Sequence, residues 1–170
     1  MSTPSSEVTI REFMQGDEES FRRLNEEWIV RYFAMEPKDE EALLHPRRNI
    51  LDRGGRIFFA VSAGETVGCC ALVAAGNGEF ELAKMAVTES ARGLGIGRRL
   101  LEHVIAEARV AGVRRLSLET NHTLTPAMRL YESVGFRHLP PERMAASPYA
   151  RSDVQMVLEL EGVRTPCDWG

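Results

Sequence analysis

The sequence predicts an α/β protein of the α+β type, built on a mixed central β-sheet flanked by helices. β-rich runs follow one another closely between residues 56 and 87, as expected for antiparallel strands joined by short turns. A glycine-rich loop, a strongly amphipathic helix and a further strand come next, which is the order of a right-handed crossover between parallel strands. At 170 residues the chain is most simply one domain, 1–170, with a core that needs no cross-links or metal.

The amino-terminal part predicts one strand and one regular helix. Residues 1–6 are polar and are expected to form a short disordered lead, with no secretory signal. Apolar and polar residues alternate over residues 8–13, which indicates a short strand. Apolar residues then recur every three or four positions up to Tyr32, which predicts a helix that Asp17 can cap and that Pro37 ends.

The next region predicts a second helix and three consecutive strands. Residues 39–51 form an irregular helical segment, which an internal proline interrupts and a following Gly-Gly pair closes. The apolar runs 56–62 and 66–75 indicate a hairpin, and residues 79–87 give a third strand after the turn Gly76-Asn77-Gly78. Because the run 66–75 is apolar on both faces, we expect it at the centre of the sheet.

The clearest element is the helix beyond the glycine-rich loop. Its buried stripe falls at i, i+3, i+4, i+7, i+8 and i+11 counted from Gly97, and Gly112 ends it. Residues 116–120 supply the next strand, which we expect to pair in parallel with the strand before the loop. Thr125 is expected to cap a shorter helix, and residues 154–160 form the last strand.

Composition limits the classes of function. A formal net charge of −4 gives no general attraction to nucleic acid or to anionic lipid, and no separate basic helical module indicates a DNA-binding regulator. The longest apolar stretch, residues 67–75, is about half the length that spans a bilayer. Cys69, Cys70 and Cys167 have no metal-ligand spacing, and the adjacent pair is interpreted as small buried hydrophobes. We expect a cytoplasmic protein without a metal.

The run Arg92-Gly93-Leu94-Gly95-Ile96-Gly97 is typical of a phosphate-binding loop. Its glycines allow close approach of a ligand to the backbone, and the helix that follows offers free N–H groups to an anion. A turn that only joins a strand to a helix is the alternative. A dinucleotide fingerprint needs a glycine where this chain has Arg98, although Glu119 lies near the expected acidic position. No Gly-Lys-Ser/Thr follows, so a nucleoside-triphosphate loop is excluded.

The pattern resembles the GNAT superfamily of acyl-CoA-dependent N-acetyltransferases. Its hallmark is Arg/Gln-x-x-Gly-x-Gly/Ala between a strand and a long helix, and Arg92, Gly95 and Gly97 match it. Residues 81–87 and 127–136 also match, in the family's order and spacing, so the resemblance covers an acyl-CoA core of about 79–137. It implies a sheet whose parallel strand pair splays to admit the pantetheine arm of the cofactor.

The resemblance also implies acetyl-CoA as the cofactor and assigns the residues that hold it. In this family the loop amides bind the pyrophosphate, and the backbone of the preceding strand pairs with the pantetheine arm. The positions that match are Met85, Ala86, Val87, Arg92, Gly93, Leu94, Gly95, Ile96, Gly97 and Arg98. Many relatives carry a pantetheine-binding asparagine where this chain has Leu124, and either Asn121 or backbone and water are expected to replace it.

Tyr131 is the residue that the resemblance assigns to chemistry. It occupies the family's tyrosine position before Gly135-Phe136, where the phenol commonly protonates the departing CoA thiolate. By helical spacing alone, an aromatic side chain at this position would be interpreted as core.

Glu81 is the leading candidate for a general base, because several relatives place a catalytic glutamate at this position of the strand. By the period of two, Glu81 shares one strand face with Ala83 and Met85. Glu79 lies on that face too and is a candidate for the acceptor site. A carboxylate that is only solvated or salt-bridged is the alternative for Glu81.

The acceptor side should be formed by the first two helices and the last loop, as it is in relatives. Candidates are Trp28, Tyr32, Phe33 and Glu36 on one side and Tyr149 with Arg151 on the other, with core packing as the alternative for Trp28. An acidic and aromatic lining would suit a cationic amine, whereas Arg151 would suit an acceptor with a carboxylate. Both possibilities stay open.

Together these observations predict an enzyme that transfers acetyl from acetyl-CoA to a primary amine of a small molecule, amino acid or peptide. The amine attacks directly in a ternary complex. The alternative is an acyl-CoA-binding or sensory module that does not turn over. Relatives are often dimers, so a homodimer is one expectation for the assembly.

Overall fold

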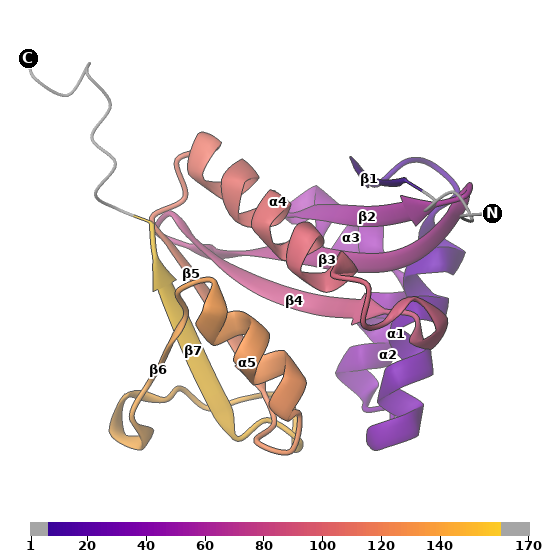
Figure 1. Cartoon of the computed structure of the whole chain (residues 1–170). Coiled ribbons are helices and arrows are strands. Elements are labelled where there is room, and N and C mark those ends of the chain that lie inside the picture. The colour runs from indigo at the N-terminus through magenta and orange to yellow at the C-terminus, as the bar shows by residue number, and fades with distance from the viewer. Residues whose placement is uncertain (1–6, 161–170) are drawn as a thin grey trace, which may run out of the picture.

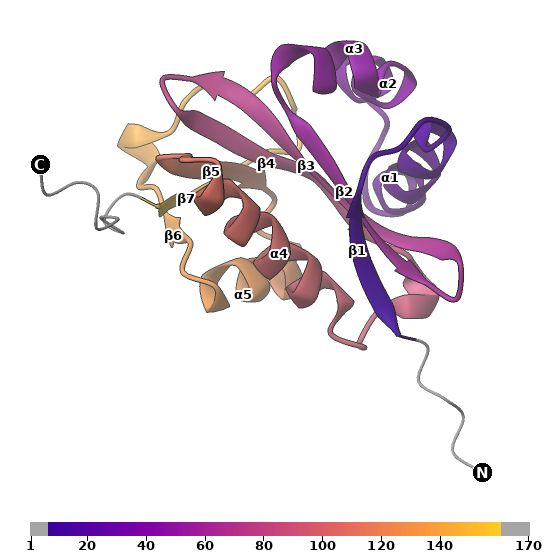
Figure 2. The same cartoon turned by 90° about the horizontal axis from the view of Figure 1, so that it is seen from above.

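Seven strands form one sheet that lies between two groups of helices in the computed structural model, which describes residues 7–160. Figure 2 shows α1 (Glu18–Tyr32), α2 (Pro37–Leu44) and α3 (Pro46–Asn49) over one face, and α4 (Ile96–Val110) and α5 (Thr125–Ser133) over the other. The expectation of a disordered lead over residues 1–6, and the remarks on Cys167, fall outside the described residues. In the described part of the chain, no helix has the length and apolar character needed to cross a membrane.

The sheet is mixed, as predicted. Its strands are β1 (Val8–Glu12), β2 (Arg56–Ser62), β3 (Glu65–Gly76), β4 (Glu79–Val87), β5 (Arg115–Thr120), β6 (Arg137–His138) and β7 (Val154–Glu159), in the order β1-β2-β3-β4-β5-β7-β6. β4 and β5 pair in parallel and the other neighbours pair antiparallel. β6 was not predicted, because two residues are too few to show a strand period.

Alternation along the strands divides most of the core into two large clusters, one on each face of the sheet, and a third, small cluster consists of Ala60, Ala91 and Ile96. Cys70 and Phe58 belong to the cluster covered by α4, whereas Cys69 and Phe59 belong to the cluster covered by α1 and α2. Both cysteines are fully buried, and burial raises the pKa of the Cys69 thiol to about 12. These two cysteines are therefore packing residues, in agreement with the prediction.

Two helix starts use different bonds from those predicted. Asp17 occupies the N-cap of α1, but its carboxylate accepts hydrogen bonds from the Met14 amide (2.7 Å) and the Arg11 guanidinium (2.6 Å) instead of a helix amide. Thr125 is the first residue of α5, and Leu124 occupies the N-cap without a side-chain bond. The predicted capping bonds were wrong for two reasons. The Asp17 carboxylate, although at the N-cap, binds groups that precede the helix, and α5 begins at Thr125, so that Leu124 is the N-cap.

The segment expected as one irregular helix over residues 39–51 divides into three short elements. α2 starts at Pro37, where proline suits the first helical turn, and α3 starts at Pro46 for the same reason. The 3₁₀ turn η1 (Leu51–Arg53) follows, and Gly54 ends it with a φ of 92°. Two further 3₁₀ turns, η2 (Glu89–Ala91) and η3 (Pro141–Arg143), lie in later connections.

β4 and β5 part soon after they pair. Their parallel register joins Glu79–Glu81 to Arg115–Ser117, but β4 continues to Val87 and β5 to Thr120. Figure 1 shows β5 and β7 running at a steep angle to β4. The sheet therefore opens at Glu81, which is the splay that the resemblance implied.

A β-bulge at Lys84 changes the faces of β4. Cys69 pairs with Ala86 and Ala71 pairs with Ala83, so three steps of β4 oppose two steps of β3. Lys84 adopts a φ of 51°, an uncommon value for a residue with a side chain. Met85 consequently packs with the cluster under α4, on the face opposite to Glu81. The prediction that both share one face was wrong, because the extra residue breaks the period of two.

Candidate active site

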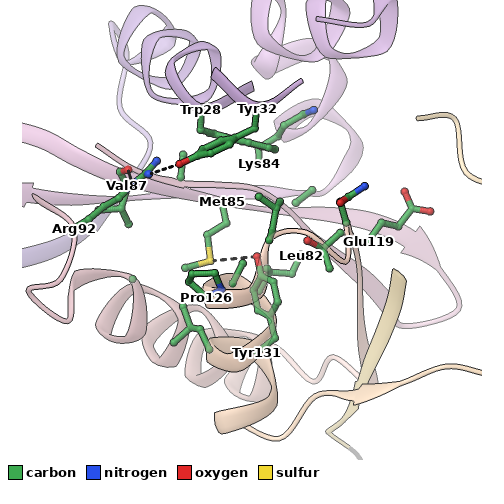
Figure 3. Close-up of a pocket in the computed structure, with 18 of the residues that line it drawn as sticks. Trp28, Tyr32, Leu82, Lys84, Met85, Val87, Arg92, Glu119, Pro126 and Tyr131 are labelled. Carbon is green, nitrogen blue, oxygen red and sulfur yellow. Dashed lines mark hydrogen bonds between the residues drawn. The ribbon is translucent and has the colours of Figure 1, made fainter. Parts of the chain in front are cut away.

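A pocket with a volume of about 620 Å³ opens where β4 and β5 part. Figure 3 shows it from the side: Arg92 and Glu119 lie toward opposite ends, with Met85 between them. Trp28, Tyr32 and Lys84 lie on the α1 side of β4, and Tyr131 lies on the other side with α5. The pocket therefore passes through the sheet from one helix layer to the other.

Most residues predicted for the site line this pocket. They are Trp28, Tyr32, Glu81, Met85, Ala86, Val87, Arg92, Gly93, Gly95, Ile96, Gly97, Arg98, Asn121, Tyr131, Tyr149 and Arg151. Two predicted residues are not brought to it. Leu94 points outward with 71% of its surface exposed, and the Glu79 carboxylate lies 3.6 Å from Arg114 and 3.9 Å from Arg115.

The glycine-rich loop presents open backbone at one end of the pocket. Gly93 and Gly95 adopt φ values of 79° and 76°, a left-handed conformation that favours glycine, and nothing lies within 4 Å of where their Cβ atoms would be. The first hydrogen bond of α4 runs from the Arg99 amide to the Gly95 carbonyl (3.1 Å). The amides of Ile96, Gly97 and Arg98 therefore have no partner within the helix and are available to an anion.

Arginines brace this loop. The Arg92 guanidinium donates to the Val87 carbonyl (3.2 Å) and to the Tyr32 hydroxyl (3.4 Å). Arg98 donates to Glu102 (3.0 Å) and to the Ser133 hydroxyl (2.9 Å). Arg92 thus holds the loop to α1, and Arg98 joins the first turn of α4 to α5. Both side chains line the pocket, so positive charge is kept beside the open amides.

Tyr131 projects from α5 into the middle of the pocket. Its hydroxyl lies 4.0 Å from Met85 Sδ, and its ring meets Phe136 edge to face at 6.0 Å. Burial, with a smaller contribution from Cys70, raises the pKa of the phenol above its ordinary value. Tyr131 is therefore a neutral proton donor at physiological pH.

Two carboxylates face the pocket at the opposite end. Within residues 7–160, the Glu81 side chain makes no hydrogen bond and no ion pair, and burial followed by the negative charge of Glu119 raises its pKa. Glu119 is held by neutral donors, the Ser147 hydroxyl at 2.9 Å and the Gln155 amide at 3.3 Å. Glu81 pairs with Ser117, two residues before Glu119, so the two acids follow one another on the same face of the splayed strands.

A buried charge cluster of Glu36, Asp39, Lys84, Tyr149 and Arg151 forms the wall beside these acids. Asp39 accepts two hydrogen bonds from Arg151 (2.6 and 2.7 Å) and one from Lys84 (2.8 Å). Arg151 also pairs with Glu36 at 3.1 Å, and Lys84 donates to the Tyr149 hydroxyl at 3.2 Å. Burial pushes the pKa of Asp39 upward, but the bonds from Arg151 and Lys84 outweigh it and lower the pKa to about 2.

Comparison with known proteins identifies the family. The model of the acetyltransferase (GNAT) family matches residues 21–136 of the chain. The chain belongs to the GNAT acetyltransferase family. Among solved structures, a GNAT acetyltransferase of Staphylococcus aureus Mu50 superimposes with a TM-score of 0.83 at 21% identity, over 91% of this chain and all of that one (100%). This likeness shows the fold.

Two curated relatives match a shorter stretch of this GNAT acetyltransferase. The uncharacterized N-acetyltransferase YsnE of Bacillus subtilis is 38% identical over 93 residues, which is 52% of this chain and 62% of that protein. The IAA acetyltransferase of Azospirillum brasilense is 36% identical over 105 residues, 61% of this chain and 66% of that protein. The matches thus span somewhat less than two thirds of either relative.

The pocket of this GNAT acetyltransferase fits the acyl-CoA donor that the family generally uses. The open backbone at Gly93 and Gly95 leaves room that a Cβ would fill, and three helix amides beside two arginines suit a pyrophosphate. Beyond the loop, residues 85–87 of β4 have no strand partner in β5, and apart from the Val87 carbonyl, which accepts from Arg92, this edge can pair with an amide-rich arm.

The side chain of Asn121 is already used by the protein. Its amide nitrogen donates to the Arg151 carbonyl (2.8 Å), and its oxygen accepts from the Thr123 amide (2.9 Å) and hydroxyl (2.5 Å). Asn121 therefore shapes the loop after β5 while it lines the pocket.

Sequence reasoning missed three charged residues of this region: Asp39, Lys84 and Glu119. In the sequence, Asp39 was noted only as the start of a helical segment. Nothing in the sequence indicated that Lys84 belongs to the site, because the bulge that turns its side chain toward Asp39 has no sequence signature. Glu119 could have been found, because parallel pairing of the two strands and the period of two place it on the same face as Glu81.

Proposed function

We propose that the protein transfers an acetyl group from acetyl-CoA to a primary amine by direct attack in a ternary complex. One observation supports this above all: Glu81, a carboxylate with no hydrogen bond or ion pair among the described residues, and Tyr131, a partly buried neutral phenol, line the same pocket from opposite faces of β4. A base and an acid on either side of one cleft are what amine acylation needs.

The donor would be held along the pocket from the loop to the splay. Amides of residues 93–98 would bind the pyrophosphate, with Arg92 and Arg98 adding charge, and the backbone of Met85, Ala86 and Val87 would pair with the pantetheine arm. Bound acetyl-CoA supplies the activated thioester carbonyl that an amine can attack.

Glu81 is proposed as the general base. An alkylammonium has a pKa near 10.4, so forming the neutral amine at pH 7 costs about 4 to 5 kcal/mol. The Glu81 carboxylate can accept that proton because no other group of the described chain binds it, and its raised pKa makes it a better proton acceptor than an ordinary glutamate. Burial beside the splay keeps bulk water from competing.

Tyr131 is proposed as the general acid on the other side. Its Oη atom gives its proton to the sulfur that leaves, and the raised pKa of the phenol keeps that proton in place until negative charge develops. Cys69 and Cys70 are fully buried in the two cores, so neither is proposed as an acyl carrier.

Thiol release is the direct test. Purified protein is mixed with acetyl-CoA and a panel of amines, amino acids and peptides, free CoA is followed with a thiol reagent, and products are identified by mass. The Glu81→Gln/Tyr131→Phe double variant serves as the blank for uncatalysed acetylation. Release above this blank with at least one acceptor is expected. Calorimetric binding of acetyl-CoA without release for any acceptor would favour a non-catalytic binding module instead.

A further inference from the structure

The acceptor end of the pocket contains both signs of charge, so the sequence alone left a cationic amine and a carboxylate-bearing acceptor equally open. The structure distinguishes the charges that are already paired from those that are not. Among the described residues that line this end, the cations are Lys84 and Arg151, and the carboxylates are Glu81 and Glu119.

Both cations are already bound by the protein. Arg151 is 13% exposed and Lys84 8%, and both pair with Asp39, whose side chain is 0% exposed. Arg151 also binds Glu36, and aromatic rings flank its guanidinium, with Tyr149 at 4.5 Å and Trp28 at 5.8 Å. A carboxylate on the acceptor would have to displace Asp39 and leave it buried without a partner.

The two carboxylates have no cation paired directly with them among the described residues. Glu81 has no hydrogen bond or ion pair in the part of the chain that the structure describes, and the partners of Glu119 are a hydroxyl and an amide, which carry no charge. Lys84 and, more weakly, Lys38 act on Glu81 through their charge, but Lys84 is bound by Asp39 at 2.8 Å and Lys38 is exposed and outside the pocket lining. Counting Glu36 and Asp39, four carboxylates face two cations here, and the excess is at Glu81 and Glu119.

We infer that the acceptor is a diamine, or a longer polyamine, without a carboxylate; this inference rests on the proposed function. One ammonium is bound by Glu81, which takes its proton, and the second is bound by Glu119. Glu119 lies two residues, on the order of 7 Å, along β5 from Ser117, the residue that pairs with Glu81, so the two acids are near enough to bind two nitrogens joined by a short alkyl chain. Asp39 and Glu36 neutralise Lys84 and Arg151, and the two ammonium groups of the acceptor neutralise Glu81 and Glu119.

Matched acceptors test the inference. Butylamine, 1,4-diaminobutane and 4-aminobutanoate share one reacting amine and differ only in a neutral, cationic or anionic tail, and the series is repeated with three and five carbons. We expect kcat/KM to be highest for the diamine, above the monoamine by about ten-fold to a hundred-fold, and lowest for the amino acid.

A variant tests the role of Glu119. Glu119→Gln keeps an acceptor oxygen for Ser147 and is expected to remove the preference for the diamine over butylamine while acetyl-CoA affinity changes little. Calorimetric binding of 1,4-diaminobutane to the CoA-loaded protein should weaken in the same variant, which gives a readout that does not depend on turnover. Glu142→Gln, an exposed acid outside the pocket lining, is the matched control and should leave both unchanged.

Each other outcome is decisive. If 4-aminobutanoate reacts as well as butylamine or better, Lys84 or Arg151 accepts the carboxylate and the inference is overturned, although acetyl transfer stands. If diamine and monoamine react equally, there is no second ammonium site. If acetyl-CoA binds but no acceptor of any charge is acetylated, the proposed function fails and the inference falls with it.

Discussion

At the scale of single residues, burial raises the pKa of both candidate catalytic groups, with different chemical results. For Tyr131 it preserves the proton, so the phenol stays a donor. For Glu81 it raises the affinity for a proton, so the carboxylate is a stronger base than an ordinary glutamate. The same desolvation therefore prepares an acid on one side of β4 and a base on the other.

Tyr131→Phe isolates the phenolic proton. We expect kcat to fall by about 10²-fold or more, because general acid catalysis contributes that much, while the acetyl-CoA Kd stays within a few-fold. Steady-state kinetics and calorimetry measure the two quantities. The control is Glu132→Gln, on the same helix as Tyr131, which removes an exposed charge that pairs with His138 of β6. It should leave kcat and the acetyl-CoA Kd unchanged. Unchanged turnover in Tyr131→Phe would remove this residue from the mechanism.

Glu81 should set an acidic limit to activity. The carboxylate must be ionised to accept a proton, and its pKa is raised by burial and Glu119 against the opposing charges of Lys84 and Lys38. We therefore expect kcat/KM to fall as pH drops through a value above the ordinary glutamate pKa of about 4.3.

Glu81→Gln should abolish the fall of kcat/KM at acidic pH and lower kcat by about 10²-fold to 10⁴-fold. The control is Glu159→Gln, a strand carboxylate that pairs with Arg115 outside the pocket. If kcat/KM of Glu81→Gln still falls at acidic pH as in the wild type, the titrating group is not Glu81.

At the scale of elements, the loop before α4 is where backbone conformation and ligand binding meet. Gly95→Ala forces a side chain into a φ of 76°, and Gly112→Ala does the same at 79° beyond the other end of α4. Both have open space around the new Cβ, so each should lose about 1 kcal/mol of unfolding free energy through strain alone. Because Gly95 lines the pocket and Gly112 does not, only Gly95→Ala should weaken acetyl-CoA binding, by roughly ten-fold.

Urea unfolding and calorimetry on both variants check this pair of expectations. Equal losses of affinity in the two variants would mean that backbone strain acts through the whole helix, and the cradle at Gly95 would lose its support.

Element boundaries were largely predictable from the sequence, because the periods of strands and helices repeat over many residues. The strand at residues 79–87 has the predicted bounds, and α4 begins within one residue of the predicted glycine. The faces of β4 beyond Ala83 were not predictable, because the bulge at Lys84 depends on a buried partner 45 residues away, Asp39. Likewise, a pocket carboxylate and a surface carboxylate look alike in sequence, as Glu81 and Glu79 demonstrate.

At the scale of the whole molecule, the cluster around Asp39 joins segments far apart in the chain. Lys84 and Arg151 lie 45 and 112 residues from Asp39, and they connect α2, β4 and the connection before β7. Their pairing closes one wall of the pocket and contributes to the stability of the fold, since a buried carboxylate with two cationic partners has a lower pKa than in the unfolded chain.

This contribution should disappear in acid. The folded-state pKa of Asp39, about 2, is below its unfolded value of 3.8, so the stabilisation is present above about pH 4 and is lost as pH falls toward 2. The loss corresponds to about 2 kcal/mol of unfolding free energy. Asp39→Asn should destabilise the protein at pH 7 by about 3 to 5 kcal/mol, because two buried cations lose their shared partner.

Urea unfolding between pH 7 and pH 3 measures both effects. The gap between wild type and Asp39→Asn should narrow as pH falls, whereas Asp52→Asn, at an exposed carboxylate, should follow the wild-type profile. A constant gap across this range would show that the effect of Asp39 is packing and not charge.

The short register between β4 and β5 has a mechanical meaning. Three residue pairs join the two parts of the sheet, and the last of them is Glu81 with Ser117. The pairing of the two parts of the sheet thus ends at Glu81, a carboxylate that lines the pocket. A change in the angle between β4 and β5 would move Glu81 relative to Glu119. The opening of the sheet and the distance between these two carboxylates would therefore change together.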